Sequence, residues 1–225
     1  MRTAFFGGSF DPPHLGHIAV ARAAQQALQL DQVLFAPVGL QPLKPAGSTA
    51  PFADRVAMTQ LAIAGQPHFE ICTIDAPDPA HVTPNYTADT LIRLRGTLPI
   101  ADQLFLLIGA DSFRTLPRWH RSAEIPCLAS LIVAARPNED LSNLADHLPR
   151  GVTLNQLATP GARQHVRYLL RNPEGTQAYL YLLPNLNFEI SATQLRRQIQ
   201  GHPTRQAPLL APAVLSYIHQ HNLYR

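Results

Sequence analysis

The chain has 225 residues, of which 46% are hydrophobic and 15% are charged, so it can bury a sizeable core and lacks the composition of a disordered protein. Its 18 Lys and Arg residues against 15 Asp and Glu residues leave a net charge of +3, and the basic residues are dispersed apart from Arg196 and Arg197. The sequence contains no basic tract of the kind that binds nucleic acid. The charge therefore favours small anionic ligands and argues against a nucleic-acid partner.

The cysteines and the first residues bear on location. Cys72 and Cys127 are far apart and form no C-x-x-C, which argues against a disulfide scaffold or a zinc site, and we expect no protein-bound metal. The first apolar run reaches Gly7 and Gly8 before a signal sequence could form, and no run approaches membrane-spanning length. We expect a cytoplasmic protein with no membrane partner, and the sequence does not indicate an oligomeric state.

The first 38 residues predict a strand, a helix and a second strand. A short apolar run covers residues 3–6, apolar residues at helical spacing follow at residues 17–30, and a second run covers residues 33–38. A unit of this kind joins parallel strands by a right-handed crossover.

The same alternation continues along the chain. Apolar runs of strand length occur at residues 70–74, 103–108, 130–135 and 178–183. Helical patterns occur at residues 52–64, 87–95, 191–200 and 211–221. Alternating strands and helices predict an α/β fold with a Rossmann-like, doubly wound and mainly parallel sheet, in a single domain that covers residues 1–225.

The segment at about residues 138–177 departs from this pattern. It is polar, contains several prolines, and shows only weak strand or helix patterns, such as those at residues 151–155 and 164–171. We expect this segment to be a peripheral insertion.

The most informative segment lies where the first strand leads into the first helix, the place at which open parallel sheets bind ligands. It reads Gly7-Gly8-Ser9-Phe10-Asp11-Pro12-Pro13-His14-Leu15-Gly16-His17. Glycines let the backbone approach a phosphate closely, and the free N–H groups at a helix N-terminus attract anions. His14 and His17 are three residues apart and share one helical face, from which two imidazoles can stabilise charge on phosphate oxygens during transfer.

A purely structural turn accounts for this segment less well than phosphate binding does. A Gly/Pro turn with two surface histidines would account for H-x-x-H alone, but here the glycines, the position after a strand and the histidine spacing coincide. The segment does not match a P-loop, a dinucleotide-binding fingerprint or a nucleophile elbow. Ser9, Asp11 and His14 also make a poor hydrolase triad. The coincidence favours phosphate binding.

A second motif lies near the end of the chain and reads Ile190-Ser191-Ala192-Thr193-Gln194-Leu195-Arg196. Ser191 followed three residues later by Gln194 is a capping-box pattern, which by itself marks only the start of a helix. Together with the first motif, this helix N-terminus with Thr193 and Arg196 is typical of a second phosphate-binding element.

These two motifs resemble those of the HxGH nucleotidyltransferase superfamily, whose second signature is I-S-x-T-x-[IL]-R. Within it, the chain is most similar to bacterial nicotinate-nucleotide adenylyltransferases, and the resemblance extends over nearly the whole length. It rests on the segments Asn85–Leu91, Ile108–Phe113, Arg118–Arg121 and Leu223–Arg225. Pantetheine-phosphate adenylyltransferases share the two outer motifs but are shorter and lack the central ones, so they are the alternative.

The resemblance implies three sets of site residues. The catalytic residues would be His14, His17, Lys44 and Arg196. The ATP-binding residues would be Gly7, Gly8, Ser9, Phe10, His14, His17, Asp111, Ser191, Thr193 and Arg196. The mononucleotide-binding residues would be Lys44, Tyr86, Thr87, Trp119 and His120.

Within these sets the resemblance also implies individual roles. Asp111, at the carboxyl end of a predicted strand, would bind ribose hydroxyls. Trp119 would stack on the pyridine ring, while backbone amides near Thr87 and His120 would receive the nicotinate carboxylate.

Several of these residues also have simpler roles. The resemblance places Lys44 near the phosphates, with Arg55 as a weaker candidate, and Leu43 stands where the family often has a histidine. From the residues alone, Lys44 could equally be a solvated loop charge. Asp111 could cap a turn and Trp119 could be ordinary packing, so these alternatives stay open.

The implied reaction is in-line attack by the 5′-phosphate of nicotinate mononucleotide on the α-phosphorus of ATP, giving nicotinate adenine dinucleotide and pyrophosphate in NAD biosynthesis. Mg²⁺ would arrive with ATP, keep bound water, and need few protein ligands. The alternatives are adenylyl transfer to nicotinamide mononucleotide or phosphopantetheine, a nucleotide-binding module without turnover, and a Rossmann oxidoreductase, whose glycine fingerprint is missing.

Overall fold

The structure is a computed structural model that describes residues 1–42, 47–78, 80, 83–135, 143–158, 165–184, 186, 190–201 and 209–225. By their contacts the residues group into two compact units. The first unit comprises residues 1–6, 21–33 and 86–187, and the second comprises residues 7–20, 34–85 and 188–225.

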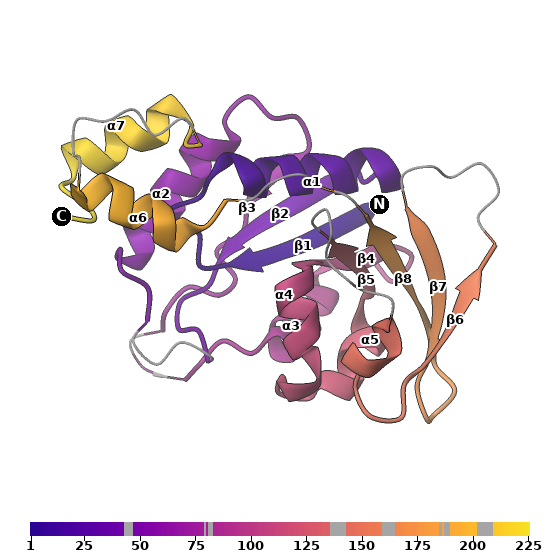
Figure 1. The fold of residues 1–225 in the computed structure, drawn as a ribbon. Helices are drawn as coiled ribbons and strands as arrows, with labels where there is room; N and C mark the ends of the chain where they lie inside the picture. Colours follow the sequence, from indigo (N-terminus) through magenta and orange to yellow (C-terminus); the bar gives the residue numbers. More distant parts are fainter. Residues whose placement is uncertain are drawn as a thin grey trace. The chain divides into compact units, whose positions relative to one another are not determined.

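The chain has an α/β fold with an eight-stranded sheet in the order β3-β2-β1-β4-β5-β8-β7-β6 (Figure 1). The strands are β1 (Arg2–Gly8), β2 (Gln32–Pro37), β3 (Phe69–Ile71), β4 (Gln103–Gly109), β5 (Ser130–Ala134), β6 (Thr153–Leu157), β7 (Val166–Arg171) and β8 (Gln177–Leu183). Strands β1, β4, β5 and β8 run parallel, with Ala4 opposite Phe105 and Leu131 opposite Leu180. The predicted doubly wound, mainly parallel sheet is confirmed.

Every helix predicted from apolar spacing is present. The α-helices are α1 (Leu15–Leu28), α2 (Phe52–Ile63), α3 (Thr87–Thr97), α4 (Ala110–Thr115), α5 (Ile125–Leu128), α6 (Ala192–Gly201) and α7 (Pro212–Gln220), and the 3₁₀ helices are η1 (Leu116–Arg118), η2 (Ser122–Glu124) and η3 (Leu144–His147). Helices α4 and α5 were not predicted, because six and four residues are too few to show a repeating apolar pattern.

The core of the first unit is built on β4 and β5. Residues 104–108 and 131–134 are at most 5% exposed, which explains their uninterrupted apolar sequence, since parallel strands are covered on both faces. Helix α3 packs against α5, α4 packs against β4 and β5, and α5 packs against β8 (Figure 1).

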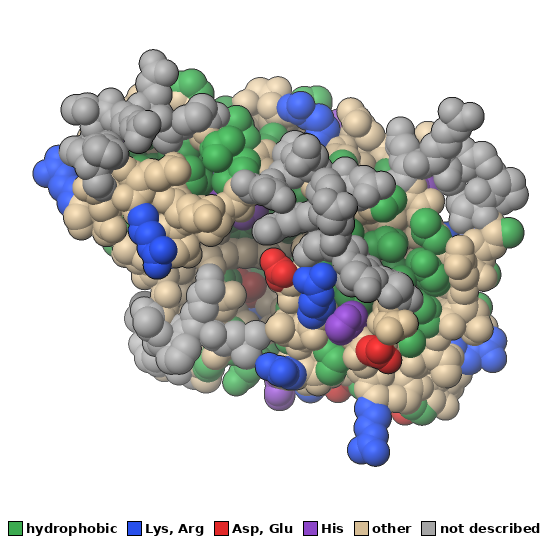
Figure 2. Space-filling view, in the orientation of Figure 1, with side chains coloured by type: hydrophobic (Ala, Val, Ile, Leu, Met, Phe, Trp, Pro, Cys, Tyr) green, Lys and Arg blue, Asp and Glu red, His purple; other side chains and the backbone are tan. Residues whose placement is uncertain are grey.

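The segment for which an insertion was predicted contributes η3, β6 and β7. Strand β7 pairs antiparallel with both β6 and β8, and β6 is the last strand in the order. Most residues of β6 and β7 are partly or fully exposed, so their apolar pattern is weak, and hydrophobic side chains are visible over β7 and β8 in Figure 2.

The core of the second unit gathers aromatic rings around β2. The ring of Phe35 lies 5.7 Å from that of Phe10 and 5.3 Å from that of Phe69. Helix α2 packs against β3 and α7, and the Tyr217 hydroxyl donates a hydrogen bond of 2.9 Å to Oδ1 of Asp54. These contacts hold together the core of the second unit, which also contains the first motif.

Two surface features of the described part of the chain bear on its partners. None of its helices combines the length and apolarity needed to cross a membrane. On the face shown in Figure 2, the described Lys and Arg side chains lie apart from one another instead of forming one patch.

We predict that Gly39→Ala lowers the free energy of unfolding by about 1–3 kcal/mol, the usual cost of overpacking. A Cβ at Gly39 would lie 2.5 Å from the carbonyl oxygen of Asp75 and 3.0 Å from Oδ1 of Asn85, so the backbone must shift. Gly96→Ala is the matched control, because in α3 a Cβ would meet no described atom within 4 Å. We expect this variant to raise the free energy of unfolding by about 0.5–1 kcal/mol. Urea unfolding of both variants measures this, and equal effects would contradict the prediction.

Candidate active site

The first motif forms the loop between β1 and α1 in the second unit. Strand β1 ends at Gly8, and α1 begins at Leu15, two residues before the predicted start. The N–H group of Val38 donates a hydrogen bond of 2.9 Å to the carbonyl of Gly8. The Ser9 hydroxyl donates a hydrogen bond of 2.9 Å to the side-chain oxygen of Gln41. The loop therefore starts from a fixed point at the end of β1.

Phe10 anchors this loop in the core. Its backbone has a φ of 47°, a left-handed conformation that is uncommon for a residue with a side chain. The ring is 1% exposed and lies 5.0 Å from the ring of His17. Phe10 was predicted to bind ATP; the residue is buried as a whole, and its contact with ATP stays a prediction.

The two histidines of the motif pack against each other. The ring centroids of His14 and His17 are 3.7 Å apart and stack at an interplanar angle of 24°. The backbone N–H of His14 donates a hydrogen bond of 3.1 Å to Nδ1 of His17. Because Nδ1 is an acceptor, the proton of a neutral His17 ring is assigned to Nε2, which is then the donor nitrogen of the ring.

The start of α1 contributes fewer free donors than expected. The N–H of Leu15 donates to the carbonyl of Leu209, and that of His17 donates to the carbonyl of His14, both at 2.9 Å. A Cβ at Gly16 would lie 3.0 Å from Nδ1 of His14. The expectation of several free N–H groups at this helix is therefore corrected: two of the first three are bonded, and Gly16 makes room for His14.

Asp11 holds the loop together. Its side chain is 4% exposed, and Oδ1 accepts hydrogen bonds from the N–H of Ala50 at 3.0 Å and the hydroxyl of Tyr224 at 2.8 Å. Oδ2 accepts a hydrogen bond of 2.7 Å from the N–H of Thr49 and lies 3.8 Å from Nη1 of Arg196. A buried carboxylate requires such partners, because it has lost its hydration.

Arg55 supports the same loop from inside the protein. Its side chain is 1% exposed, with Nη1 donating to the carbonyl of Ser9 at 2.7 Å and Nε donating to that of Ala50 at 3.2 Å. Burial lowers the pKa of its guanidinium, and the charge of Asp11 acts in the opposite direction. Arg55 was the weaker phosphate candidate, but its guanidinium is bonded to loop carbonyls.

The second motif forms the start of α6 in the same unit. Ser191 directly precedes the helix, and its carbonyl accepts a hydrogen bond of 3.0 Å from the N–H of Leu195. Nη1 of Arg196 donates to the carbonyl of Asp11 at 2.7 Å, and Nη2 donates to Oγ1 of Thr193 at 3.3 Å. The structure thus joins the two motifs, although Asp11 and Arg196 are 185 residues apart in sequence.

Asp111 and Trp119 lie in the first unit. Asp111 is exposed in the first turn of α4, directly after β4, and pairs with Arg114 at 3.1 Å. Nε1 of Trp119 donates a hydrogen bond of 3.1 Å to Oγ1 of Thr115. The position of Asp111 agrees with the expected carboxyl end of a strand, and the ligand contacts of both residues stay predictions.

Three mononucleotide candidates lie together around the start of α3. Thr87 is its first residue, and Tyr86 precedes it without a side-chain cap. The ring of Tyr86 lies 4.4 Å from that of His120. Arg121 fastens this region, because it donates to Asp89 at 2.8 Å and to both carboxylate oxygens of Glu124.

Lys44 lies outside the described residues, as does Leu43. Its predicted roles in catalysis and mononucleotide binding therefore stay predictions. Across the described part of the chain, no three His, Cys, Asp or Glu side chains gather as a metal site would require.

Comparison with known proteins gives consistent results. A family model described as cytidylyltransferase-like matches residues 5–198. A protein of Trichlorobacter lovleyi, named "Probable nicotinate-nucleotide adenylyltransferase", is 37% identical over the full length of both chains. A protein of Roseiflexus sp. with the same name is 38% identical, over 97% of this chain and 96% of its own.

The chain belongs to the nicotinate-nucleotide adenylyltransferase family. The resemblance inferred from the motifs is thereby confirmed. In fold it is similar to a solved structure of Plasmodium falciparum nicotinic acid mononucleotide adenylyltransferase complexed with NaAD, with a TM-score of 0.71 at 14% identity, covering 99% of this chain and 97% of that one.

Two residues of the candidate site were given no role from the sequence. Asp11 lies inside the first motif and Tyr224 inside the last matching segment, but nothing in either segment shows that their side chains meet. The one available signal was the acid itself, because a lone carboxylate in a loop suited to phosphate needs nearby donors.

The pKa of His17 lies well below its usual value. Loss of hydration on burial is the larger cause, and the neighbouring His14 adds to it. The unfolded chain takes up a proton on this histidine near pH 6.5, while the folded protein keeps the ring neutral to lower pH. The unfolded state therefore binds more protons, and the contribution of His17 to stability is present above pH 6.5 and is lost as the pH falls below it.

We predict that the ligand-free protein loses about 1 kcal/mol of unfolding free energy per pH unit from this histidine as the pH falls below 6.5. His17→Asn should remove this contribution to the slope of unfolding free energy against pH. The exposed His219→Asn serves as the control and should keep it. Urea unfolding at pH 5, 6 and 7 compares the three proteins. An unchanged slope in His17→Asn would contradict the assignment.

Proposed function

We propose that this protein transfers the adenylyl group of ATP to nicotinate mononucleotide, giving nicotinate adenine dinucleotide and pyrophosphate. Full-length relatives carry the name of this activity, and a protein with this fold was solved with NaAD. One observation supports the chemistry most directly: His14 and His17 stack in the loop that Arg196 contacts through Asp11. Groups from both ends of the sequence that would bind phosphate thus lie in one unit.

The reaction needs alignment more than a base. The 5′-phosphate of the mononucleotide is ionised near neutral pH, so it can attack the α-phosphorus of ATP in line with the departing pyrophosphate. Such phosphoryl-type transfers are catalysed chiefly by positioning and by electrostatic stabilisation. Correct orientation alone can lower the barrier by about 7–11 kcal/mol.

The second unit would hold the triphosphate. His17 would donate from Nε2 as a neutral ring, with His14 stacked beside it. Arg196 and Thr193 would bind the β- and γ-phosphates, with Ser191 at the start of α6. Lys44 would add a further charge. A donor fixed before the reaction stabilises the charge that develops in the transition state without reorganising.

The first unit would hold the mononucleotide and the ribose. Asp111 would accept hydrogen bonds from ribose hydroxyls. Trp119, oriented by its bond to Thr115, would stack on the pyridine ring. The amides at the start of α3, beginning at Thr87, are not capped by a side chain, and with the amide near His120 they would receive the nicotinate carboxylate.

The cofactor and the location complete the proposal. Mg²⁺ would enter with ATP, because this ion usually binds substrate phosphates and keeps several waters. The substrates are small molecules. Cys72 and Cys127, both among the described residues, are thiols that form no disulfide, which suits a reducing cytoplasm.

A pyrophosphate-release assay tests the substrate assignment. ATP is offered with nicotinate mononucleotide, nicotinamide mononucleotide or phosphopantetheine, each at equal concentration. We expect the highest kcat/KM with nicotinate mononucleotide. Release with phosphopantetheine alone would transfer the assignment to that substrate, and binding of ATP with no release from any of the three would indicate a binding module.

We predict that His17→Ala lowers kcat by about 10²–10³ without unfolding the protein, because it removes a fixed donor to the transition state. His14→Ala should act similarly. Since the two rings stack and serve one charge, the double variant should lose less than the product of the single losses. A loss of kcat in the double variant equal to the product of the two single losses would show that the histidines act separately.

We predict that Trp119→Ala weakens the binding of both pyridine mononucleotides by about 1–3 kcal/mol, by analogy with stacking of bases on aromatic rings. The amides at α3 would recognise the carboxylate, so the preference for the acid over the amide should remain. The values of kcat/KM for both substrates, in the wild type and the variant, measure this. Loss of the preference would assign carboxylate positioning to Trp119.

A further inference from the structure

Tyr224 is buried and hydrogen-bonded to the first motif. Its side chain is 5% exposed, and its hydroxyl donates a hydrogen bond of 2.8 Å to Oδ1 of Asp11, a residue 213 positions earlier. The backbone of Tyr224 has a φ of 61°, a left-handed conformation that is unfavourable for a residue with a Cβ. A buried tyrosine held in this conformation at a buried carboxylate indicates a specific contact.

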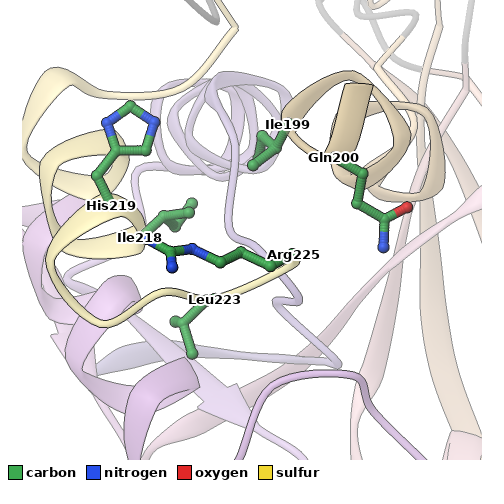
Figure 3. Close-up of a pocket in the computed structure, with 6 residues that line it drawn as sticks. All are labelled: Ile199, Gln200, Ile218, His219, Leu223 and Arg225. Carbon is green, nitrogen blue, oxygen red and sulfur yellow. The ribbon is translucent and has the colours of Figure 1, made fainter. Parts of the chain in front are cut away.

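The neighbours of Tyr224 face a different environment. Leu223 and Arg225 help to line a pocket of about 440 Å³ between α6 and α7. Figure 3 shows the lining residues, which are Ile199, Gln200, Ile218, His219, Leu223 and Arg225. The N–H of Leu223 donates to the carbonyl of Ile218 at 3.0 Å, so this segment is fixed to α7 while Tyr224 reaches the loop.

The Asp11 carboxylate has more than one possible partner for its charge. Its oxygens accept hydrogen bonds from Tyr224 and from the amides of Thr49 and Ala50, at 2.7 to 3.0 Å. Arg196 lies farther away, at 3.8 Å from Oδ2, and Nη1 donates instead to the Asp11 carbonyl. The carboxylate thus receives three short hydrogen bonds from neutral donors, and Arg196 is its more distant neighbour.

We propose that Tyr224 is a positioning residue for Arg196: by satisfying Oδ1 of Asp11, it helps to hold the guanidinium at the Asp11 carbonyl, where it would meet the triphosphate, instead of against the carboxylate. This inference rests on the proposed binding of ATP by Arg196. If the hydroxyl is removed, the buried carboxylate loses a donor and compensates by pairing more closely with Arg196. An arginine engaged with a carboxylate is a weaker phosphate ligand, because a guanidinium binds phosphate best through both of its parallel donors.

The phenol can fill this role across the physiological range. Burial and the Asp11 charge raise the pKa of Tyr224 far above its usual value, so the hydroxyl stays protonated and remains a donor. The neighbouring Arg55 is bonded to loop carbonyls at 2.7 and 3.2 Å. Among the groups around Asp11, the Tyr224 hydroxyl can be deleted without changing charge or backbone.

The test is binding of a non-hydrolysable ATP analogue to Tyr224→Phe, measured by calorimetry. We expect affinity to fall about 10-fold, the effect of losing a hydrogen bond to a charged group. In steady-state assays the KM for ATP should rise while the KM for the mononucleotide stays within about twofold. Tyr217→Phe is the matched control, because it also removes a tyrosine hydroxyl from an aspartate, at 2.9 Å from Asp54, and should leave affinity unchanged.

A double-mutant comparison separates positioning from simple structural support. In an Arg196→Gln background, Tyr224→Phe should lower the affinity for the analogue by less than about twofold, because its effect passes through Arg196. The same 10-fold loss in both backgrounds, or no loss in either, would overturn the proposal. If Tyr224→Phe is only marginally stable, the rise in melting temperature on adding the analogue still reports its affinity.

Binding of the analogue does not depend on turnover, so the two proposals can fail separately. A wild type that binds the analogue but releases no pyrophosphate refutes the proposed function, and the same comparison of variants still decides the role of Tyr224. An active wild type with an unaffected Tyr224→Phe refutes only the positioning role. A wild type that binds no analogue overturns both.

Discussion

A carboxylate removed from water must be matched by donors, and the second unit is arranged around one such group. Asp11 is 4% exposed, and its partners come from the loop before α2, from α6 and from the last described segment. Each partner brings a distant part of the chain to the loop between β1 and α1. Removal of one partner leaves the charge buried and less satisfied, which costs more than an ordinary hydrogen bond. Arg196 contacts the loop through this single residue.

The charge balance of that loop suits a polyanionic ligand. Asp11 is the acid near two arginines, of which Arg55 is buried and bonded to carbonyls while Arg196 keeps part of its surface exposed. Burial and the neighbouring His14 lower the pKa of His17, so this ring offers a hydrogen bond in place of a positive charge. Compact, fixed donors of this kind act more strongly in a site of low polarity than they would in water.

The first unit has a different role in the proposed reaction, in which it would hold a flat ring and a carboxylate. Tyr86 and His120 pack together, and Trp119 is fixed by Thr115. Arg121, in a left-handed conformation, bonds Asp89 and Glu124, and these bonds raise the pKa of its guanidinium. Residues beside the proposed ligand contacts thus serve to shape the loop that carries them.

The sequence by itself determined the α/β class, the longer strands and helices, and the positions of the two motifs, because each of these is encoded in local periodicity or in consecutive residues. It missed α4 and α5, which have only six and four residues and so cannot repeat an apolar pattern, and it gave only weak signals for the half-exposed β6 and β7. No sequence pattern indicates that Asp11, Arg55 and Tyr224 lie together in the folded protein. Only the tertiary structure decided that Phe10 is core and that Arg55 lies beneath the loop. Burial and pairing between residues up to 213 positions apart depend on which elements pack, and local sequence does not encode that.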